Sequence, residues 1–96
     1  MNREQVLNIL ARSKPALAAR WGVTHLALFG STARGTARAD SDIDLLVSFD
    51  GPATSERYFG VQFFLEDLLD RPVDLVTDKA LRPELKTFIE KEAMHV

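Results

Sequence analysis

Two neighbouring stretches decide the fold: GSTARG at positions 30–35 and SDIDLLV at positions 41–47. In the second stretch, apolar residues recur at every other position from Ile43 onward, as in a strand with one face toward a core. Asp42 and Asp44 are two residues apart, so their side chains leave the opposite face of that strand. The sequence therefore predicts a strand that is buried on one side and carries two carboxylates on the other.

Two more strands are predicted on either side of this one. The central strand extends over Ile43–Phe49 and ends in a turn at positions 50–52. An apolar run predicts a strand over Thr24–Phe29, ended by the glycine that opens the first stretch. A third strand is predicted from Pro72 to Thr77, with Asp74 in its middle.

The amino-terminal third of the chain is predicted to be helical. Asn2 and Gln5 have the spacing of a capping box, which begins a helix. Pro15 lacks an N–H and clashes with the preceding turn, so the first helix should stop before it. Ser13 then caps a second, short helix, and Gly22 ends it.

Two further helices follow the strands. Thr54 or Ser55 caps the first of them. Its predicted apolar side consists of Tyr58, Val61, Phe64, Leu65 and Leu68. Pro83 begins the second helix, whose predicted apolar side consists of Leu85, Phe88 and Ile89. Strands that alternate with helices indicate an α/β or α+β fold, with a small mixed sheet flanked by helices.

Size and composition limit the classes of function. The 96 residues suit one domain over positions 1–96, and the absence of cysteine excludes disulfides and thiolate metal sites. A formal net charge of −2 gives no reason to expect nucleic-acid or membrane binding. The polar amino terminus does not resemble a signal peptide, and we expect a cytoplasmic protein without a membrane span.

Three carboxylates are the candidate catalytic residues and metal ligands. Asp42 and Asp44 share one face of a strand, and Asp74 lies within another apolar strand. Carboxylates gathered on a sheet face repel one another and are costly to desolvate. Mg²⁺ would neutralise them, because it takes a few carboxylate ligands and keeps positions for phosphate oxygens and water.

A phosphate cradle is predicted beside these acids. Gly30 permits a sharp turn and a close approach of phosphate, and the free N–H groups of a following helical turn favour an anion. Ser31 adds a hydroxyl donor, and Arg34 adds a planar cation. Ser41, directly before the first acid, completes the candidate nucleotide-binding set. Arg34 could instead form a surface ion pair, and Ser41 could merely orient Asp42.

Phosphate and metal at one place indicate phosphoryl-type transfer. Two Mg²⁺ ions about 3.5–4 Å apart can clamp the attacking and leaving oxygens of an in-line displacement. We expect Asp42 and Asp44 to bridge both ions. Asp74 would bind one ion and accept the proton of the attacking hydroxyl. The α-phosphorus is attacked, and pyrophosphate leaves.

These motifs carry a resemblance to a known superfamily. The stretches 30–35, 41–47 and 73–76 resemble the polymerase-β-like nucleotidyltransferases, whose signature is Gly-Ser, then Asp-x-Asp, then an Asp in a later strand. The short chain and the Ala-Arg-Gly after Gly-Ser look like the minimal nucleotidyltransferase (MNT) branch. The resemblance covers the chain from the first strand to the last helix and matches all three carboxylate positions.

The resemblance implies a biological role that the residues alone do not give. MNT proteins typically act as antitoxins beside a helical HEPN-domain ribonuclease, in a type VII-like toxin–antitoxin pair. The implied reaction is transfer of AMP from ATP to a tyrosine of that toxin, with both proteins in a hetero-oligomer. Larger superfamily members carry a further domain that holds the acceptor, so a partner protein presenting the hydroxyl is a sensible candidate here.

Two other functions stay open. The enzyme could act on the hydroxyl of a small molecule, or the domain could neutralise its partner by binding and masking it without catalysis. A nucleic-acid polymerase is disfavoured by the acidic net charge.

Several conspicuous residues are interpreted as structural. We expect His25 and His95 to be structural or solvated, Trp21 to pack where a helix meets a strand, and positions 90–92 to form a solvated helix end. Phe59 and Phe63 lie off the apolar stripe of their helix. They either face another layer of the domain or form an exposed patch for a partner.

Overall fold

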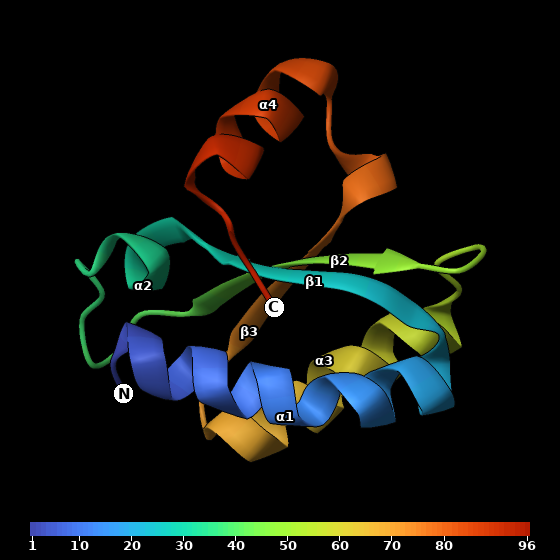
Figure 1. Cartoon of the computed structure of the whole chain (residues 1–96), viewed down its shortest axis with the longest axis horizontal. Helices are drawn as coiled ribbons and strands as arrows, with labels where there is room; N and C mark the ends of the chain where they lie inside the picture. Colours follow the sequence, from blue (N-terminus) through green and yellow to red (C-terminus); the bar gives the residue numbers. More distant parts are fainter.

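A computed structural model describes residues 1–96 and shows a four-stranded sheet with helices on both faces (Figure 1). The elements follow in the order α1 (Arg3–Trp21), β1 (Val23–Phe29), α2 (Gly30–Arg34), β2 (Ile43–Phe49), α3 (Ser55–Leu69), β3 (Val73–Thr77), the 3₁₀ turn η1 (Asp78–Ala80), α4 (Pro83–Glu92) and β4 (Met94–His95). The strand order in the sheet is β3-β2-β1-β4. The predicted mixed α/β class is confirmed.

The sheet is mixed because the connections differ in length. A short excursion through α2 returns β2 antiparallel to β1, whereas the α3 crossover brings β3 in parallel to β2. Parallel neighbours need such a crossover, since a tight turn only reverses the chain. The carboxyl-terminal β4 pairs antiparallel with β1 at the opposite edge.

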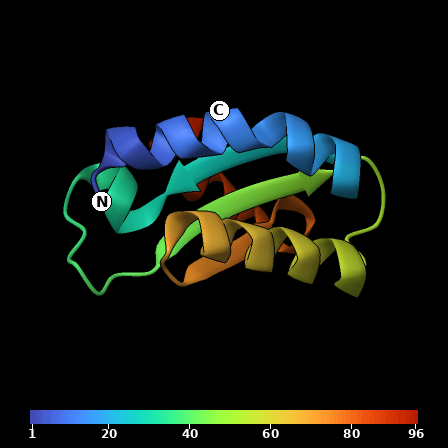
Figure 2. The same cartoon turned by 90° about the horizontal axis from the view of Figure 1, so that it is seen from below.

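The hydrophobic core lies between the sheet and one helical layer. Helices α1 and α3 lie side by side across this face (Figure 2). Every second residue of β2, from Ile43 onward, points into the core, which confirms the predicted alternation. The core residues with no exposed surface are Val6, Leu10, Leu17, Leu28, Leu45, Val47, Val61 and Leu65. Burial of such side chains stabilises the fold by about 1.5–3 kcal/mol each.

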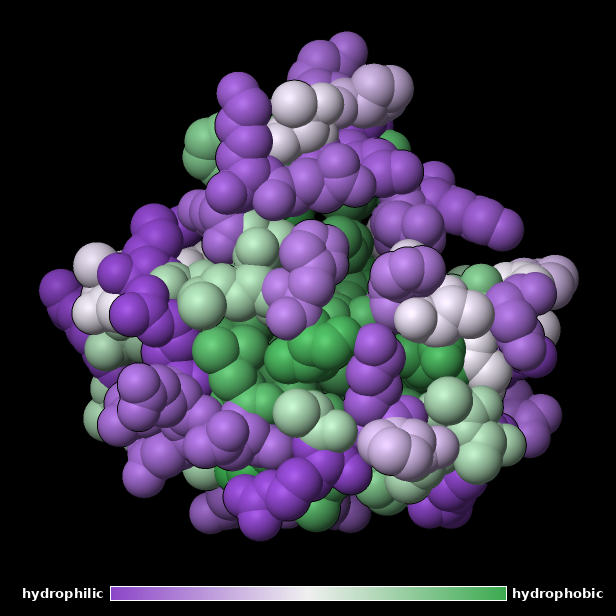
Figure 3. Space-filling model, viewed as in Figure 1, coloured by the Kyte–Doolittle hydropathy of each residue, from purple (hydrophilic) through white to green (hydrophobic).

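The other face of the sheet is only partly covered. Helix α4 arches over it and stands away from the strands (Figure 1). None of its residues is buried, and Leu85 and Phe88 are 53% and 64% exposed. The predicted apolar side of this helix is therefore mostly solvent-facing. Figure 3 shows hydrophobic residues in the middle of the molecule between α4 and α1, with hydrophilic residues around them.

The prediction of two helices before β1 is wrong. Helix α1 is continuous from Arg3 to Trp21, with Pro15 inside it. Ser13 is not a cap: it is buried and its hydroxyl donates to the carbonyl of Leu10 at 3.0 Å. Burial of apolar residues before and after Pro15 outweighs the hydrogen bond that the proline cannot donate.

Local signals for helix ends are confirmed. Asn2 and Gln5 form the capping box, and Gly22 ends α1 in the left-handed conformation. The Thr54 hydroxyl caps α3 by accepting from Arg57 N at 3.2 Å. The two-residue β4 was not predicted. No helix is long and apolar enough to cross a membrane.

Candidate active site

Two of the predicted acids meet on adjacent strands. In the parallel pairing of β2 and β3, Asp44 lies directly opposite Asp74. Residues opposite each other in a sheet project to the same face, so the two carboxylates share the face that α4 overarches. The predicted convergence of the second and third strands is therefore present in the backbone register itself.

The neighbouring acids affect the ionisation of Asp44. The pKa of Asp44 is raised from its ordinary 3.8 to about 6, first by partial burial and next by the charge and hydrogen-bonding side chain of Asp74. The charge of Asp42 raises the pKa further, and the Arg34 guanidinium lowers it. Each neighbouring carboxylate makes ionisation of Asp44 harder. Asp42, Asp44, Asp74 and Arg34 thus lie close enough to influence one another's charge, and we call these four residues one electrostatic unit.

A tied loop positions Asp42, which is exposed and directly precedes β2. The Ser41 hydroxyl accepts from Arg38 N at 2.9 Å. The Arg71 guanidinium donates to the carbonyl of Ser41 and, at 3.2 Å, to the carbonyl of Arg38. Ser41 therefore helps to hold the loop that precedes Asp42, and its direct contact with a nucleotide stays a prediction. Arg71, just before β3, was not predicted; its partners are backbone atoms 30 or more residues away.

Gly30 brings the glycine turn against the acids. Its φ of +74° is unfavourable for other residues, and a Cβ at this position would lie 2.9 Å from Cγ of Asp44 and nearer still to a carboxylate oxygen. Only a residue without a side chain permits this approach. Gly30 is also the first residue of the short helix α2, the helical turn that the sequence predicted.

Two donors of the predicted phosphate cradle bind a carboxylate of the same chain, that of Glu92. Gly30 N donates to the Glu92 carboxylate at 3.1 Å, and the Arg34 guanidinium pairs with the same carboxylate at 3.1 Å. Ser31 is half-buried beside Gly30. The prediction of a solvated helix end at positions 90–92 is wrong for Glu92. It reaches across 58 and 62 residues of sequence, a contact without a local signal.

Side chains from α3 fix β3, the edge strand that carries Asp74. The Glu66 carboxylate accepts from Val73 N at 2.9 Å, and the Gln62 amide donates to the carbonyl of Val73 at 3.1 Å. These contacts satisfy backbone groups that an edge strand otherwise leaves to solvent. The position of Asp74 thus depends on helix side chains as well as on the sheet.

The donor set fits a divalent cation. Carboxylates are the ligands that Mg²⁺ prefers. A cation at this face would also relieve the repulsion that raises the pKa of Asp44. In this structure, however, no group of three acidic or histidine side chains is arranged closely enough to hold a metal ion. The side chains of Asp42 and Asp74 are exposed, so a change of side-chain rotamer can move either carboxylate without disturbing the core.

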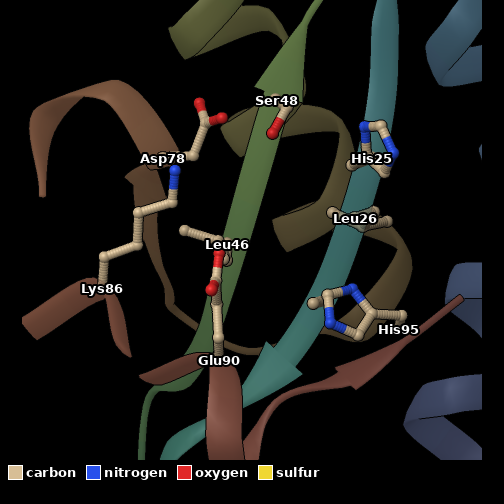
Figure 4. Close-up of a pocket in the computed structure, with 9 residues that line it drawn as sticks. His25, Leu26, Leu46, Ser48, Asp78, Lys86, Glu90 and His95 are labelled. Atoms are coloured by element: carbon tan, nitrogen blue, oxygen red, sulfur yellow. The ribbon is translucent and has the colours of Figure 1, made fainter. Parts of the chain in front are cut away.

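A cleft of about 210 Å³ continues along the acid-bearing face, under α4. Ser48 and Leu46 extend the row that begins at Asp44. Figure 4 shows the cleft between strands β1, β2 and β4 and, on the other side, η1 and α4. Its polar lining consists of His25, Ser48, Asp78, Lys86, Glu90 and His95. Both histidines are exposed and neither lies in a metal cluster. Their position on the acid-bearing face was not predicted.

A second group of aromatic residues lies at the end of α1 and on α3, the helices on the other face of the sheet. Trp21 packs edge-on against Phe64 of α3, with ring centroids 5.5 Å apart, and Arg20 lies over its ring. Its predicted packing role at the end of α1 is confirmed. Phe59 and Phe63 stack on each other and are 47% and 59% exposed, so they are not in the core.

Comparison with known proteins agrees with this geometry. A sheet that gathers acids beside a glycine turn suits an enzyme that handles phosphate groups. The chain belongs to the nucleotidyltransferase domain family, whose sequence model matches residues 10–95. It is 34% identical over 93 residues to the protein adenylyltransferase MntA of Thermococcus cleftensis, covering 97% of this chain and 94% of the relative.

Solved structures share the fold. One, described as a minimal nucleotidyltransferase, is 38% identical with a TM-score of 0.83 and covers 98% of this chain and 95% of its own. Another is a tri-AMPylated HEPN toxin of Shewanella oneidensis in complex with an MNT antitoxin. The matched chain of that complex is 20% identical to this protein with a TM-score of 0.61, and the match covers 98% of this chain and 67% of that one. The second likeness concerns the fold alone.

Proposed function

We propose that this protein is a Mg²⁺-dependent adenylyltransferase that transfers AMP from ATP to a hydroxyl of a partner protein. The observation that carries the proposal is the pairing of Asp44 with Asp74 on one sheet face, directly against the Gly30 turn. Family membership supports the reaction class, and the name of the Thermococcus relative supports an adenylyl group and a protein acceptor.

Asp42, Asp44 and Asp74 would hold Mg²⁺. Bound there, Mg²⁺ supplies positive charge to the triphosphate and to the attacking oxygen. Gly30 N and the Ser31 hydroxyl bind phosphate oxygens, and the Arg34 guanidinium neutralises their charge. The Gly30 turn keeps these donors next to Asp44 because no side chain intervenes.

The chemical step replaces a phosphoanhydride bond of ATP with a phosphate ester bond to the acceptor. The acceptor hydroxyl oxygen bonds to the α-phosphorus, and the bond from this phosphorus to the oxygen bridging to the β-phosphorus breaks. Pyrophosphate leaves with that oxygen. Asp74, which is exposed on the edge strand β3, accepts the proton of the acceptor hydroxyl.

The acceptor that we propose is a tyrosine of a HEPN-domain toxin, and the two proteins form a toxin–antitoxin pair. The AMPylated HEPN toxin seen with an MNT antitoxin of the same fold supports this partner. A transferred AMP adds bulk and negative charge beside the toxin's own catalytic groups, which silences it.

Incubation with the HEPN protein encoded nearest to this gene, with ATP and Mg²⁺, tests the proposal by intact-mass analysis. We expect the partner to gain the mass of one or more adenylyl groups, and peptide mapping to locate them on tyrosine. An unmodified partner, with AMP instead on small hydroxylated compounds, would contradict the protein acceptor.

Matched substitutions identify the residues responsible. Asp44→Asn and Asp74→Asn should each slow AMP transfer by at least roughly a hundredfold. Asp67→Asn, an exposed carboxylate of α3, makes the same chemical change outside the site and should leave transfer unchanged. Equal rates for all three variants would exclude the acid face as the active site.

A further inference from the structure

One carboxylate of the chain occupies both main donors of the proposed phosphate cradle. Oε1 of Glu92 accepts from Gly30 N at 3.1 Å, and Oε2 lies 3.1 Å from Nη1 of Arg34. The side chain of Glu92 is only 21% exposed, whereas that of Arg34 is 51% exposed. The geometry resembles that of a phosphate with two oxygens on neighbouring donors.

Apart from Gly30 N and Arg34, the surroundings of Glu92 disfavour a negative charge. Glu92 is the last residue of α4, where the helix dipole disfavours negative charge. It also approaches a face that already carries Asp42, Asp44 and Asp74, with Arg34 as the one cation in their electrostatic unit. An ion pair as exposed as this one contributes little to stability. A triphosphate, with more charge and more oxygens, can compete for the same donors.

We propose that Glu92 is a built-in competitor of the nucleotide: its carboxylate occupies a phosphate position and must leave before the triphosphate binds Gly30 and Arg34. The inference rests on the proposed function, because that function makes these donors the phosphate cradle. Glu92 thereby sets nucleotide affinity without touching the reacting atoms.

The surroundings of Glu92 allow the movement. Helix α4 has no buried residue, so its shift exposes little apolar surface. The chain after it stays attached, because β4 pairs with β1 and Val96 N donates to the carbonyl of Leu26 at 3.0 Å. Ala93, between the helix and β4, has extended backbone angles. Release of Glu92 therefore needs a side-chain rotation or a small tilt of α4, and no loss of the sheet.

An alternative role for the same contact predicts the opposite change in nucleotide affinity. If Glu92 only orients Arg34 for the nucleotide, its loss should weaken nucleotide binding. If it competes, its loss should strengthen binding, because the donors become free and one negative charge disappears from the face.

Calorimetric titration with ATP in the presence of Mg²⁺, and separately with inorganic tripolyphosphate, decides between the two. We expect Glu92→Gln and Glu92→Ala to bind both ligands about two- to fivefold more tightly than the wild type. Glu84→Gln is the matched control, since it removes the same charge from the exposed first turn of α4. Its affinity should not change. Equal or weaker binding by the Glu92 variants would overturn the competitor role.

A second measurement uses the unaltered protein. During an NMR titration with tripolyphosphate, the amide signals of Glu92 and Ala93 should shift together with that of Gly30. A shift at Gly30 alone would overturn the proposal. Failure of every form to bind either ligand would remove the phosphate cradle, and with it the proposed function. If the Glu92 variants still transferred AMP but bound ATP with unchanged affinity, the competitor role would be wrong and the proposed function would stand.

Discussion

Gly30 is the residue at which backbone conformation and chemistry constrain each other most closely. It has a φ of +74° and no room for a Cβ beside the Asp44 carboxylate. Gly35, at the other end of α2, has a similar φ of +78° but no atom within 4 Å of a built Cβ. The two glycines therefore separate the cost of the backbone angle from the cost of crowding the acid.

We predict that Gly35→Ala lowers the free energy of unfolding by roughly 1 kcal/mol and keeps AMP transfer, since only the backbone angle is strained. Gly30→Ala should cost roughly 2–4 kcal/mol and abolish transfer, because its methyl group also displaces Asp44. Chemical denaturation and the transfer assay measure both effects. Equal stability and activity of the two variants would contradict the close approach at Gly30.

Asp44 gives a prediction on pH dependence. Its pKa of about 6 in the folded protein lies above the ordinary 3.8, so the native state binds this proton more tightly than the unfolded state. Stability should therefore fall as pH rises from about 4 to about 6, and the ionised group is a net cost at higher pH.

Asp44→Asn removes that cost, so without divalent cations the variant should melt at a higher temperature than the wild type above pH 6. The difference should vanish below about pH 4, where Asp44 is protonated in both states. Thermal melts across this pH range measure it. If the difference in melting temperature were the same at all pH values, the pKa of Asp44 would not be raised in the folded protein.

At the scale of elements, the sequence predicts best what is encoded locally. The bounds of β2 and the beginning of α3 follow from alternation and from the Thr54 cap, and both are confirmed. The break at Pro15 was wrong because tertiary packing on both sides of the proline holds one helix together. Strand β4 has only two residues, too short for a periodic signal, and exists through its pairing with β1.

The same distinction holds for the site. The acids could be found because alternation places Asp42 and Asp44 on one face and Asp74 interrupts an apolar strand. Glu92 and Arg71 could not be found, because their partners lie 30 or more residues away in sequence. A contact of that length depends on how the elements pack, and no local pattern announces it.

Helix α4 should contribute little to stability. We predict that Leu85→Ser and Phe88→Ser each change the free energy of unfolding by no more than about 0.5 kcal/mol, since both side chains are mostly exposed. Leu65→Ala, in the fully buried stripe of α3, should cost about 2–5 kcal/mol. Urea denaturation compares them, and a large loss at Phe88 would mean that α4 packs on the sheet more closely than described.

At the scale of the whole molecule, one layer stabilises the fold and the other face performs chemistry. Helices α1 and α3 bury the core on one face of the sheet (Figure 2). The opposite face carries the acids and the Gly30 turn, and also the cleft (Figure 4). Exposed Phe59 and Phe63 lie on α3, so a partner contact there would leave the acid face accessible.

Co-expression with the HEPN partner separates catalysis from masking. We predict that Asp44→Asn still binds the partner in a pull-down but no longer rescues growth, whereas Asp67→Asn rescues fully. The physical reason is that Asn cannot supply the charge of a Mg²⁺ ligand, while the surface for the partner is unchanged. Full rescue by Asp44→Asn would leave masking as the explanation.

The most direct test of the acid face is a crystal structure with Mn²⁺, as a visible substitute for Mg²⁺, and a non-hydrolysable ATP analogue. The account predicts an anomalous peak within bonding distance of the Asp44 and Asp74 carboxylates, with Asp42 turned toward it and phosphate on Gly30 N. The account would be contradicted if nucleotide and Mn²⁺ bound elsewhere on the molecule while the side chains of Asp44 and Asp74 contacted only each other.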